Sequence, residues 1–183
     1  MFSGLYLITD NNQDGQLLTK VKAALTGGAA IVQYRAKEIR PDDRRKMAEK
    51  LKRLCRQYKA RLIINDLPEL AHEIDADGVH LGQDDVSIAQ ARQILGHQKL
   101  IGISTHSVDQ ALKAEAHGAD YIAIGSIFPT DSKDDTNLVG LKTLSMVRKA
   151  VRIPVVAIGG ITPDGAFEAL DACLLYTSDA ADD

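Results

Sequence analysis

The stretch RLIINDLPELAHEIDADGVHLG, residues 61–82, places two short apolar runs on either side of a more polar segment. RLIIN (61–65) and GVHLG (78–82) have the length and composition of strands, and Pro68 between them is typical of the first turn of a helix. A strand, a helix and a second strand in so short a stretch predict a βαβ unit with parallel strands.

The same pattern repeats along the chain about every 25 residues, as expected for successive βα units. Several of the apolar runs are continuous, which is typical of strands covered on both faces, as in a parallel sheet. Seven strands are predicted: LYLIT (5–9), AIVQYR (30–35), RLIIN (61–65), GVHLG (78–82), LIGIS (100–104), YIAIG (121–125) and PVVAIG (154–159).

Helices are predicted between these strands. The segment 41–59 carries an apolar stripe on an otherwise charged helix, which indicates an outer layer. Ser107 with Gln110 predicts a capping box, and Thr162 with Pro163 predicts a helix start. The stripe consists of Met47, Leu51, Leu54, Cys55 and Tyr58.

Alternating strands and helices predict either an open, doubly wound sheet or a closed barrel. The stretch after the first strand, LITDNNQDG (7–15), does not match the G-x-G-x-x-G pattern of a doubly wound nucleotide-binding sheet. We therefore expect an α/β fold of the TIM (β/α)8 barrel type, with its chemistry at the carboxyl ends of the strands.

Composition narrows the class of protein further. With 183 residues and 45% apolar content, the chain is expected to form one domain, and a net charge of −3 gives no sign of nucleic-acid or membrane-surface binding. Cys55 and Cys173 form no disulfide or metal-ligand pattern, and no targeting or membrane-spanning segment is visible. These observations predict a soluble, cytoplasmic protein.

Polar side chains follow nearly every predicted strand. In AIVQYRAKE (30–38), the alternation of side chains along a strand puts Gln33, Arg35 and Lys37 on one side. The two cations would suit binding of a diphosphate. The alternative, that they form a charged edge exposed to solvent, is about equally favoured by this stretch alone. The others are Asn65, Asp66, Gln83, Asp84, Asp85, Ser104, Thr105, Thr130, Ser132, Lys133, Gly159 and Gly160.

Asp66 and Asp85 follow successive strands, so their carboxylates can share a hard cation such as Mg²⁺. The alternative for Asp66, favoured when that residue is taken alone, is that it caps the helix starting near Pro68. Asp84 and Asp85 also resemble a helix cap.

The loop 127–136 and the glycine pair Gly159-Gly160 follow the last two predicted strands. The loop carries hydroxyls and a lysine but also fits an ordinary surface loop. The glycines precede a helix, where backbone N–H groups can bind a phosphate, or they form a tight turn. His80 lies inside the fourth predicted strand and His106 lies at the end of the fifth, so both are candidates for a site, yet no histidine spacing indicates zinc.

The motifs QYRAK, IIND, GVHLGQDD, GIST, IFPTDSK and AIGGI follow one another on successive predicted strands. In this order they closely resemble the thiamine phosphate synthase family over about residues 4–172. The resemblance implies that 4-amino-2-methyl-5-hydroxymethylpyrimidine diphosphate and a thiazole phosphate join to give thiamine phosphate and diphosphate.

The resemblance also implies a role for each matching residue. Mg²⁺ would be bound by Asp66 and Asp85, and the thiazole phosphate by Gly160 with the loop Thr130, Asp131 and Ser132. The pyrimidine diphosphate would be bound by Gln33, Arg35, Lys37, Asn65, Ser104 and Lys133.

Among these residues, Arg35, Lys37, Ser104 and Lys133 are the expected catalytic groups. The departing diphosphate gains negative charge in the transition state, where cations accelerate a reaction most. No nucleophilic side chain is required, because the thiazole nitrogen attacks.

Two alternatives remain: a thiazole tautomerase-like barrel and an inactive, ligand-binding fragment. Because Asn65, Asp66, Asp85 and Lys133 are all present, the synthase is favoured over the tautomerase. The expected partners are small-molecule substrates, and a homo-oligomer is compatible with the resemblance.

The end of the chain, EALDACLLYTSDAADD, departs from the family pattern at Cys173. Residues 1–172 are expected to form seven βα units of the barrel, and residues 173–183 an atypical, disordered or non-native tail. Too few residues remain for an eighth strand and helix, so we expect the native carboxyl terminus to be absent.

Overall fold

The computed structural model describes residues 4–9, 15–130 and 138–174. The chain divides into two compact units, Met1–Ile101 and Gly102–Asp183. Within the described ranges, no helix is both long enough and apolar enough to cross a membrane.

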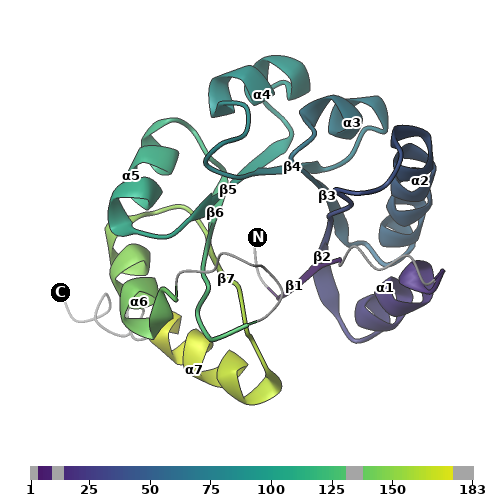
Figure 1. Cartoon of the computed structure of the whole chain (residues 1–183). Helices are drawn as coiled ribbons and strands as arrows, with labels where there is room; N and C mark the ends of the chain where they lie inside the picture. Colours follow the sequence, from purple (N-terminus) through teal and green to yellow (C-terminus); the bar gives the residue numbers. More distant parts are fainter. Residues whose placement is uncertain (1–3, 10–14, 131–137, 175–183) are drawn as a thin grey trace. The chain divides into compact units, whose positions relative to one another are not determined.

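The first unit alternates strands and helices, with the helices α1, α2 and α3 along one side of the strands (Figure 1). Its strands pair in parallel and in chain order, β1 with β2, β2 with β3 and β3 with β4. The elements are β1 (Leu5–Ile8), α1 (Leu17–Thr26), β2 (Ala29–Tyr34), α2 (Pro41–Gln57), β3 (Arg61–Asn65), α3 (Pro68–Glu73), β4 (Gly78–Leu81) and α4 (Ile88–Leu95).

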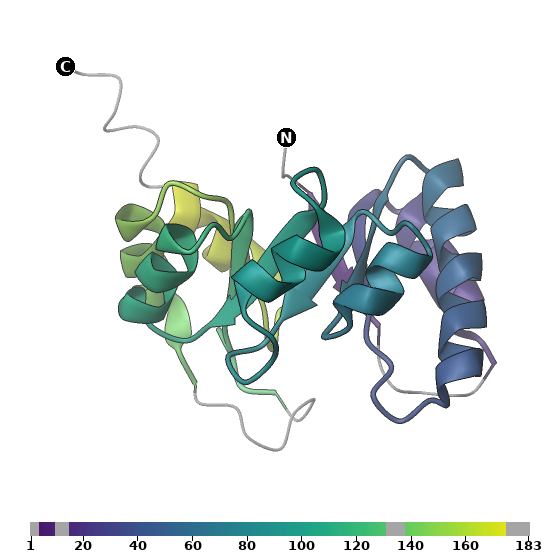
Figure 2. The same cartoon turned by 90° about the horizontal axis from the view of Figure 1, so that it is seen from above.

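The second unit continues the alternation. Its strands β5, β6 and β7 also pair in parallel, and α6 packs between α5 and α7 (Figures 1 and 2). The elements are β5 (Leu100–Thr105), which begins in the first unit, α5 (Val108–Ala116), β6 (Tyr121–Ile124), α6 (Gly140–Ala150), β7 (Val155–Ala157) and α7 (Pro163–Leu174).

Burial explains why the strands read as continuous apolar runs. Leu62 and Ile63 are neighbours in β3 and point to opposite faces, yet both are 0% exposed. Each face of the strand is therefore covered, as the apolar runs predicted. All seven predicted strands are confirmed, with bounds that agree with the predicted ones to within two residues.

The predicted stripe of α2 is confirmed at Leu51 and Cys55, which are buried. It is wrong at Tyr58, which lies just past the helix and is 37% exposed. Because the helix ends at Gln57, the side chain of Tyr58 no longer follows the helical repeat.

Helix starts follow the expected chemistry with one difference. The Ser107 hydroxyl accepts a hydrogen bond from the N–H of Gln110, and the Thr162 hydroxyl accepts one from Gly165. The side chain of Gln110, however, accepts from the N–H of His106, so the capping box is only half formed.

Candidate functional site

The candidate residues of the first unit lie at the carboxyl ends of β2, β3 and β4. Asp66 follows β3 directly, with its N–H donating to the carbonyl of His80 over 2.8 Å. Its backbone has φ +63°, a left-handed conformation that non-glycine residues rarely adopt. The backbone thus holds the Asp66 side chain in a direction that an ordinary strand end would not give.

Three charged side chains meet around Asp66. The Lys37 ammonium lies 3.0 Å from Asp66 Oδ2, and the Asp85 carboxyl lies close enough to Asp66 to raise its pKa. Asp85 Oδ2 in turn accepts a hydrogen bond of 2.6 Å from the N–H of Gly82. The structure therefore brings together both predicted metal ligands and one predicted diphosphate ligand.

Burial and the neighbouring Asp85 raise the pKa of Asp66, while Lys37 acts in the opposite direction. Two carboxylates in contact repel each other when both are ionised, and partial burial weakens the hydration of Asp66. A cation between them would relieve both effects.

The alternative role as a helix cap is excluded for Asp66, Asp84 and Asp85. The residue at the start of α3 is Leu67, with no side-chain cap, so Asp66 does not cap that helix. Helix α4 is capped by Ser87, whose hydroxyl forms a complete capping box with Gln90. Asp84 and Asp85 therefore do not cap α4.

Gln33 and Arg35 occupy the end of β2 and the residues after it. Gln33 is 3% exposed, and its amide Nε2 donates to the hydroxyl of Tyr6 over 2.8 Å. Arg35 is held through its backbone: its N–H donates to Thr9 Oγ1 over 3.0 Å, and its carbonyl accepts from the same hydroxyl over 3.3 Å. Asn65 ends β3 and is half-buried.

Thr9 and Tyr6 are contributors that the sequence reasoning missed. Thr9 is 5% exposed. Its N–H donates to the carbonyl of Gln33, so the pairing of β1 with β2 continues one residue past the end of β1. The sequence did contain a signal for Thr9, because it is a polar residue at the end of the first apolar run. The other candidate residues occupy the same place at the ends of the other apolar runs.

The described candidate residues of the second unit lie at the end of β5 and after β6 and β7. Ser104 is half-buried in β5, opposite Ala123 of β6. Thr130 is half-buried, while the predicted residues Asp131, Ser132 and Lys133 lie outside the described residues.

The glycine pair packs against the chain that follows β6. Gly159 and Gly160 have φ +86° and +67°, and a Cβ on Gly160 would lie 2.6 Å from the carbonyl oxygens of Phe128 and Pro129. The N–H of Phe128 donates to the carbonyl of Gly159 over 3.0 Å. Only glycine fits this close approach, so the predicted tight turn is present next to the start of the 130–133 loop.

The predicted histidines differ in their surroundings. His80 is buried in β4, 3% exposed, whereas His106 is exposed after β5. Among the described residues, no three His, Cys, Asp or Glu side chains come together as a metal-binding group.

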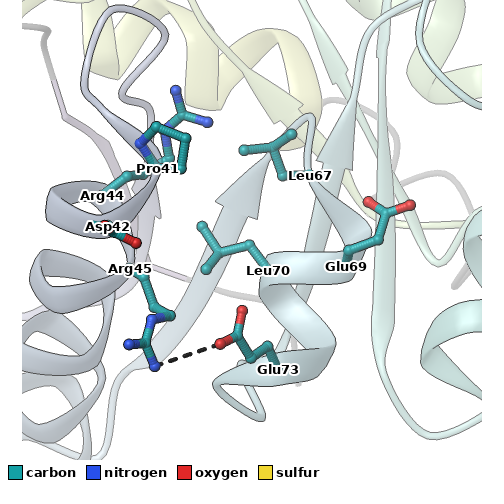
Figure 3. Close-up of a pocket in the computed structure, with 8 residues that line it drawn as sticks. All are labelled: Pro41, Asp42, Arg44, Arg45, Leu67, Glu69, Leu70 and Glu73. Carbon is teal, nitrogen blue, oxygen red and sulfur yellow. Dashed lines mark ion pairs between the residues drawn. The ribbon is translucent and has the colours of Figure 1, made fainter.

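A groove of about 310 Å³ lies in the first unit between α2 and α3 (Figure 3). None of the candidate residues lines it. Its walls are Pro41, Asp42, Arg44, Arg45, Leu67, Glu69, Leu70 and Glu73.

The chain is similar to known proteins over most of its length. The family model for thiamine monophosphate synthase matches residues 5–174. The thiamine-phosphate synthase of Nitrosococcus oceani is 48% identical over 174 residues, which cover 92% of this chain and 79% of that protein. The bifunctional thiamine biosynthesis protein ThiED of Geobacter sulfurreducens is 44% identical over 92% of this chain, which spans only 34% of that protein.

A solved structure gives the same result. Thiamine phosphate pyrophosphorylase from Pyrococcus furiosus superimposes with a TM-score of 0.82 at 39% identity, covering 91% of this chain and 80% of that one. The expected fold class, an α/β fold of the TIM-barrel type, is thereby confirmed.

Proposed function

The chain belongs to the thiamine monophosphate synthase family, transferases of thiamine biosynthesis, and we propose that its own activity depends on Mg²⁺ held by Asp66 and Asp85. The substrates are the pyrimidine diphosphate and the thiazole phosphate, and the products are thiamine phosphate and diphosphate. The observation that carries the proposal is the contact of the two carboxylates beside the Lys37 ammonium.

The residues present fit a magnesium ion. Carboxylate oxygens are the ligands that Mg²⁺ prefers, and this ion usually takes one or two of them, with water and substrate phosphates completing its coordination. The contact of Asp66 with Asp85, which raises the pKa of Asp66, supports the same assignment. When bound, Mg²⁺ would neutralise charge on the diphosphate leaving group.

The chain's own side chains bind and orient the pyrimidine diphosphate. Gln33 and Asn65 orient the substrate through neutral amides, while Arg35 and Lys37 contribute positive charge. Lys37 would leave Asp66 for the diphosphate when Mg²⁺ neutralises that carboxylate. The full predicted set is Gln33, Arg35, Lys37, Asn65, Ser104 and Lys133.

The thiazole phosphate would bind in the second unit. Gly160 would offer a backbone N–H in a turn with positive φ, and Thr130 to Ser132 would supply hydroxyl and backbone groups. Packing of the chain at Phe128 and Pro129 against Gly160 supports a shared site for these two segments.

Charge on the leaving diphosphate grows as its bond to the pyrimidine methylene breaks. Arg35, Lys37 and Lys133 lower the barrier because their attraction to that charge increases toward the transition state. For Lys133→Ala we expect a loss in kcat, and an unchanged kcat would contradict its catalytic role.

The test is an assay of thiamine phosphate and diphosphate formation from the two substrates, with Mg²⁺ and after its removal by a chelator. Asp85→Ala should lose more than about tenfold in kcat/KM at limiting Mg²⁺. The matched control is Asp84→Ala, which removes the exposed neighbouring carboxylate and should keep the wild-type rate. Full activity without Mg²⁺, or equal rates in the two variants, would contradict the metal assignment.

A further inference from the structure

The side chain of Arg44 ties helix α2 to the loop that carries Lys37. Its Nη2 donates to the carbonyl of Ile39 over 2.8 Å and contacts the carbonyl of Lys37 at 3.3 Å. The loop of residues 35–40, which connects β2 with α2, thus has two carbonyls fixed by one guanidinium.

The position of the Arg44 cation is electrostatically unfavourable for the folded protein. It lies close to the amino end of α2, where the helix dipole favours acidic side chains such as Asp42 and Asp43 and disfavours cations. Its Nε atom is buried without a hydrogen-bond partner, as is the hydroxyl of Tyr34; within the described part of the chain these are the only two such side-chain atoms. A residue that breaks several local rules at once is expected near functional groups.

The neighbouring Arg45 shows what an ordinary arginine does on this helix. The side chains of Arg44 and Arg45 leave α2 in opposite directions (Figure 3). Arg45 is exposed and pairs with Glu49 at 3.5 Å and Glu73 at 3.4 Å. It therefore provides a matched comparison of equal charge on the same turn.

We propose that Arg44 is a positioning residue, which fixes the 35–40 loop so that the Lys37 ammonium reaches the Asp66 carboxylate and the diphosphate site beside it. The Lys37 side chain is 54% exposed, so packing covers only part of it. Without Arg44, the Lys37 side chain would sample a larger volume, and fewer of its positions would reach the site. The link to diphosphate rests on the proposed function; the anchoring of the loop does not.

The first experiment measures amide hydrogen exchange of residues 35–40 by mass spectrometry in the whole protein. In Arg44→Met we expect exchange in this loop to be at least about tenfold faster, because two of its carbonyls lose their restraint. Arg45→Met should exchange like the wild type. Wild-type exchange of the loop in Arg44→Met would overturn the proposal.

The second experiment links the anchor to Lys37 by a double-mutant cycle, with the affinity for inorganic diphosphate in the presence of Mg²⁺ measured by calorimetry. Arg44→Met and Lys37→Met should each weaken binding, by about tenfold, and the double variant should bind no more weakly than Lys37→Met alone. Arg44→Lys should restore part of the affinity. Additive losses in the double variant would overturn the proposal.

Two controls separate the possible failures. If Arg44→Met does not fold, as judged by circular dichroism, Arg44→Lys and Arg44→Gln replace it in both experiments. If the wild-type protein binds no diphosphate, the proposed function is wrong, and the exchange of the loop then decides by itself whether Arg44 anchors it.

Discussion

The Lys37 ammonium and the Asp66 carboxylate lie 3.0 Å apart, and Asp66 also contacts the carboxyl of Asp85. Lys37 therefore occupies the neighbourhood in which a magnesium ion would interact with Asp66. An ammonium and a divalent cation beside one carboxylate repel each other, so the lysine and the metal compete for it.

The first prediction concerns this competition. Replacing Lys37 by Met should strengthen Mg²⁺ binding in the absence of substrate by a few-fold, because an exposed pair contributes at most about 1 kcal/mol. Titration calorimetry with Mg²⁺ measures the effect. The exposed Lys46→Met is the control and should bind Mg²⁺ like the wild type; weaker binding by Lys37→Met than by the control would refute the competition.

The second prediction uses the raised pKa of Asp66. Burial first, and then Asp85, make the ionised form of Asp66 unfavourable in the folded protein. A carboxyl with a raised pKa is most favourable to the fold below its ordinary value of 3.8, and that contribution is lost as the pH rises through the folded pKa. Asp66→Asn should therefore be at least as stable as the wild type at pH 7, although it lacks one of the two proposed metal ligands.

Asparagine is the suitable replacement because it tolerates the positive φ of Asp66 better than alanine does. Urea unfolding at pH 7 and at pH 3.5 should show any stability gain at the higher pH only. Mg²⁺ affinity should fall by more than about tenfold. A variant clearly less stable than the wild type at pH 7 would mean that Lys37 outweighs burial and Asp85.

The third prediction concerns Asp75, a surface residue whose pKa is lowered, in the opposite direction to that of Asp66. Asp75 is paired with Lys52 at 2.7 Å and with Lys99 at 2.5 Å, and these hydrogen bonds, Lys52 first, lower its pKa from 3.8 to about 2. The stabilisation is present above pH 3.8 and is lost as the pH falls toward 2. Because the Asp75 side chain is 75% exposed, the effect is small, below about 1 kcal/mol.

Asp75→Asn tests this pair without disturbing the backbone, which has φ +54° at this residue. The variant should be slightly less stable than the wild type at pH 7, and the difference should vanish between pH 4 and pH 2 in acid-unfolding curves. The exposed Asp84 has no ion pair among the described residues, and Asp84→Asn, as the control, should show no such difference between pH 7 and pH 2. A difference that persists at pH 2 would assign the effect to something other than the ionised pair.

The positions of the candidate residues could be predicted because the βα repeat places each strand end, and the polar residue that follows an apolar run is visible in the sequence. The geometry of Asp66 could not be predicted from the sequence, because its positive φ and its contact with Asp85 arise only where the ends of two separate strands meet. The contact made by Thr9 was missed for a related reason. Thr9 acts on the backbone of Arg35, 26 residues away, and no local pattern shows such a contact.

The fourth prediction concerns Gly160. Alanine at Gly160 would meet the carbonyls of Phe128 and Pro129 at 2.6 Å, in addition to a cost of about 1–2 kcal/mol for its positive φ. Gly118 is the matched control, since its φ is +88° but nothing lies within 4 Å of its added Cβ. Gly160→Ala should be less stable than Gly118→Ala by at least about 1 kcal/mol in urea unfolding, and it should raise the KM for the thiazole phosphate. Equal losses in both variants would show that crowding does not matter.

The fifth prediction tests the hydrogen bonds between the Thr9 hydroxyl and the backbone of Arg35. Thr9→Val keeps the shape of the side chain but leaves the partly buried N–H and carbonyl of Arg35 without their hydroxyl partner, which should cost about 1–3 kcal/mol. Because the backbone of Arg35 then loses its fixed position, the KM for the pyrimidine diphosphate should rise as well. Thr143→Val also loses a hydroxyl hydrogen bond, of 2.8 Å to the carbonyl of Val139 in the second unit, and should change stability without changing that KM. A normal KM in Thr9→Val would show that the guanidinium of Arg35 finds the substrate without the support of Thr9.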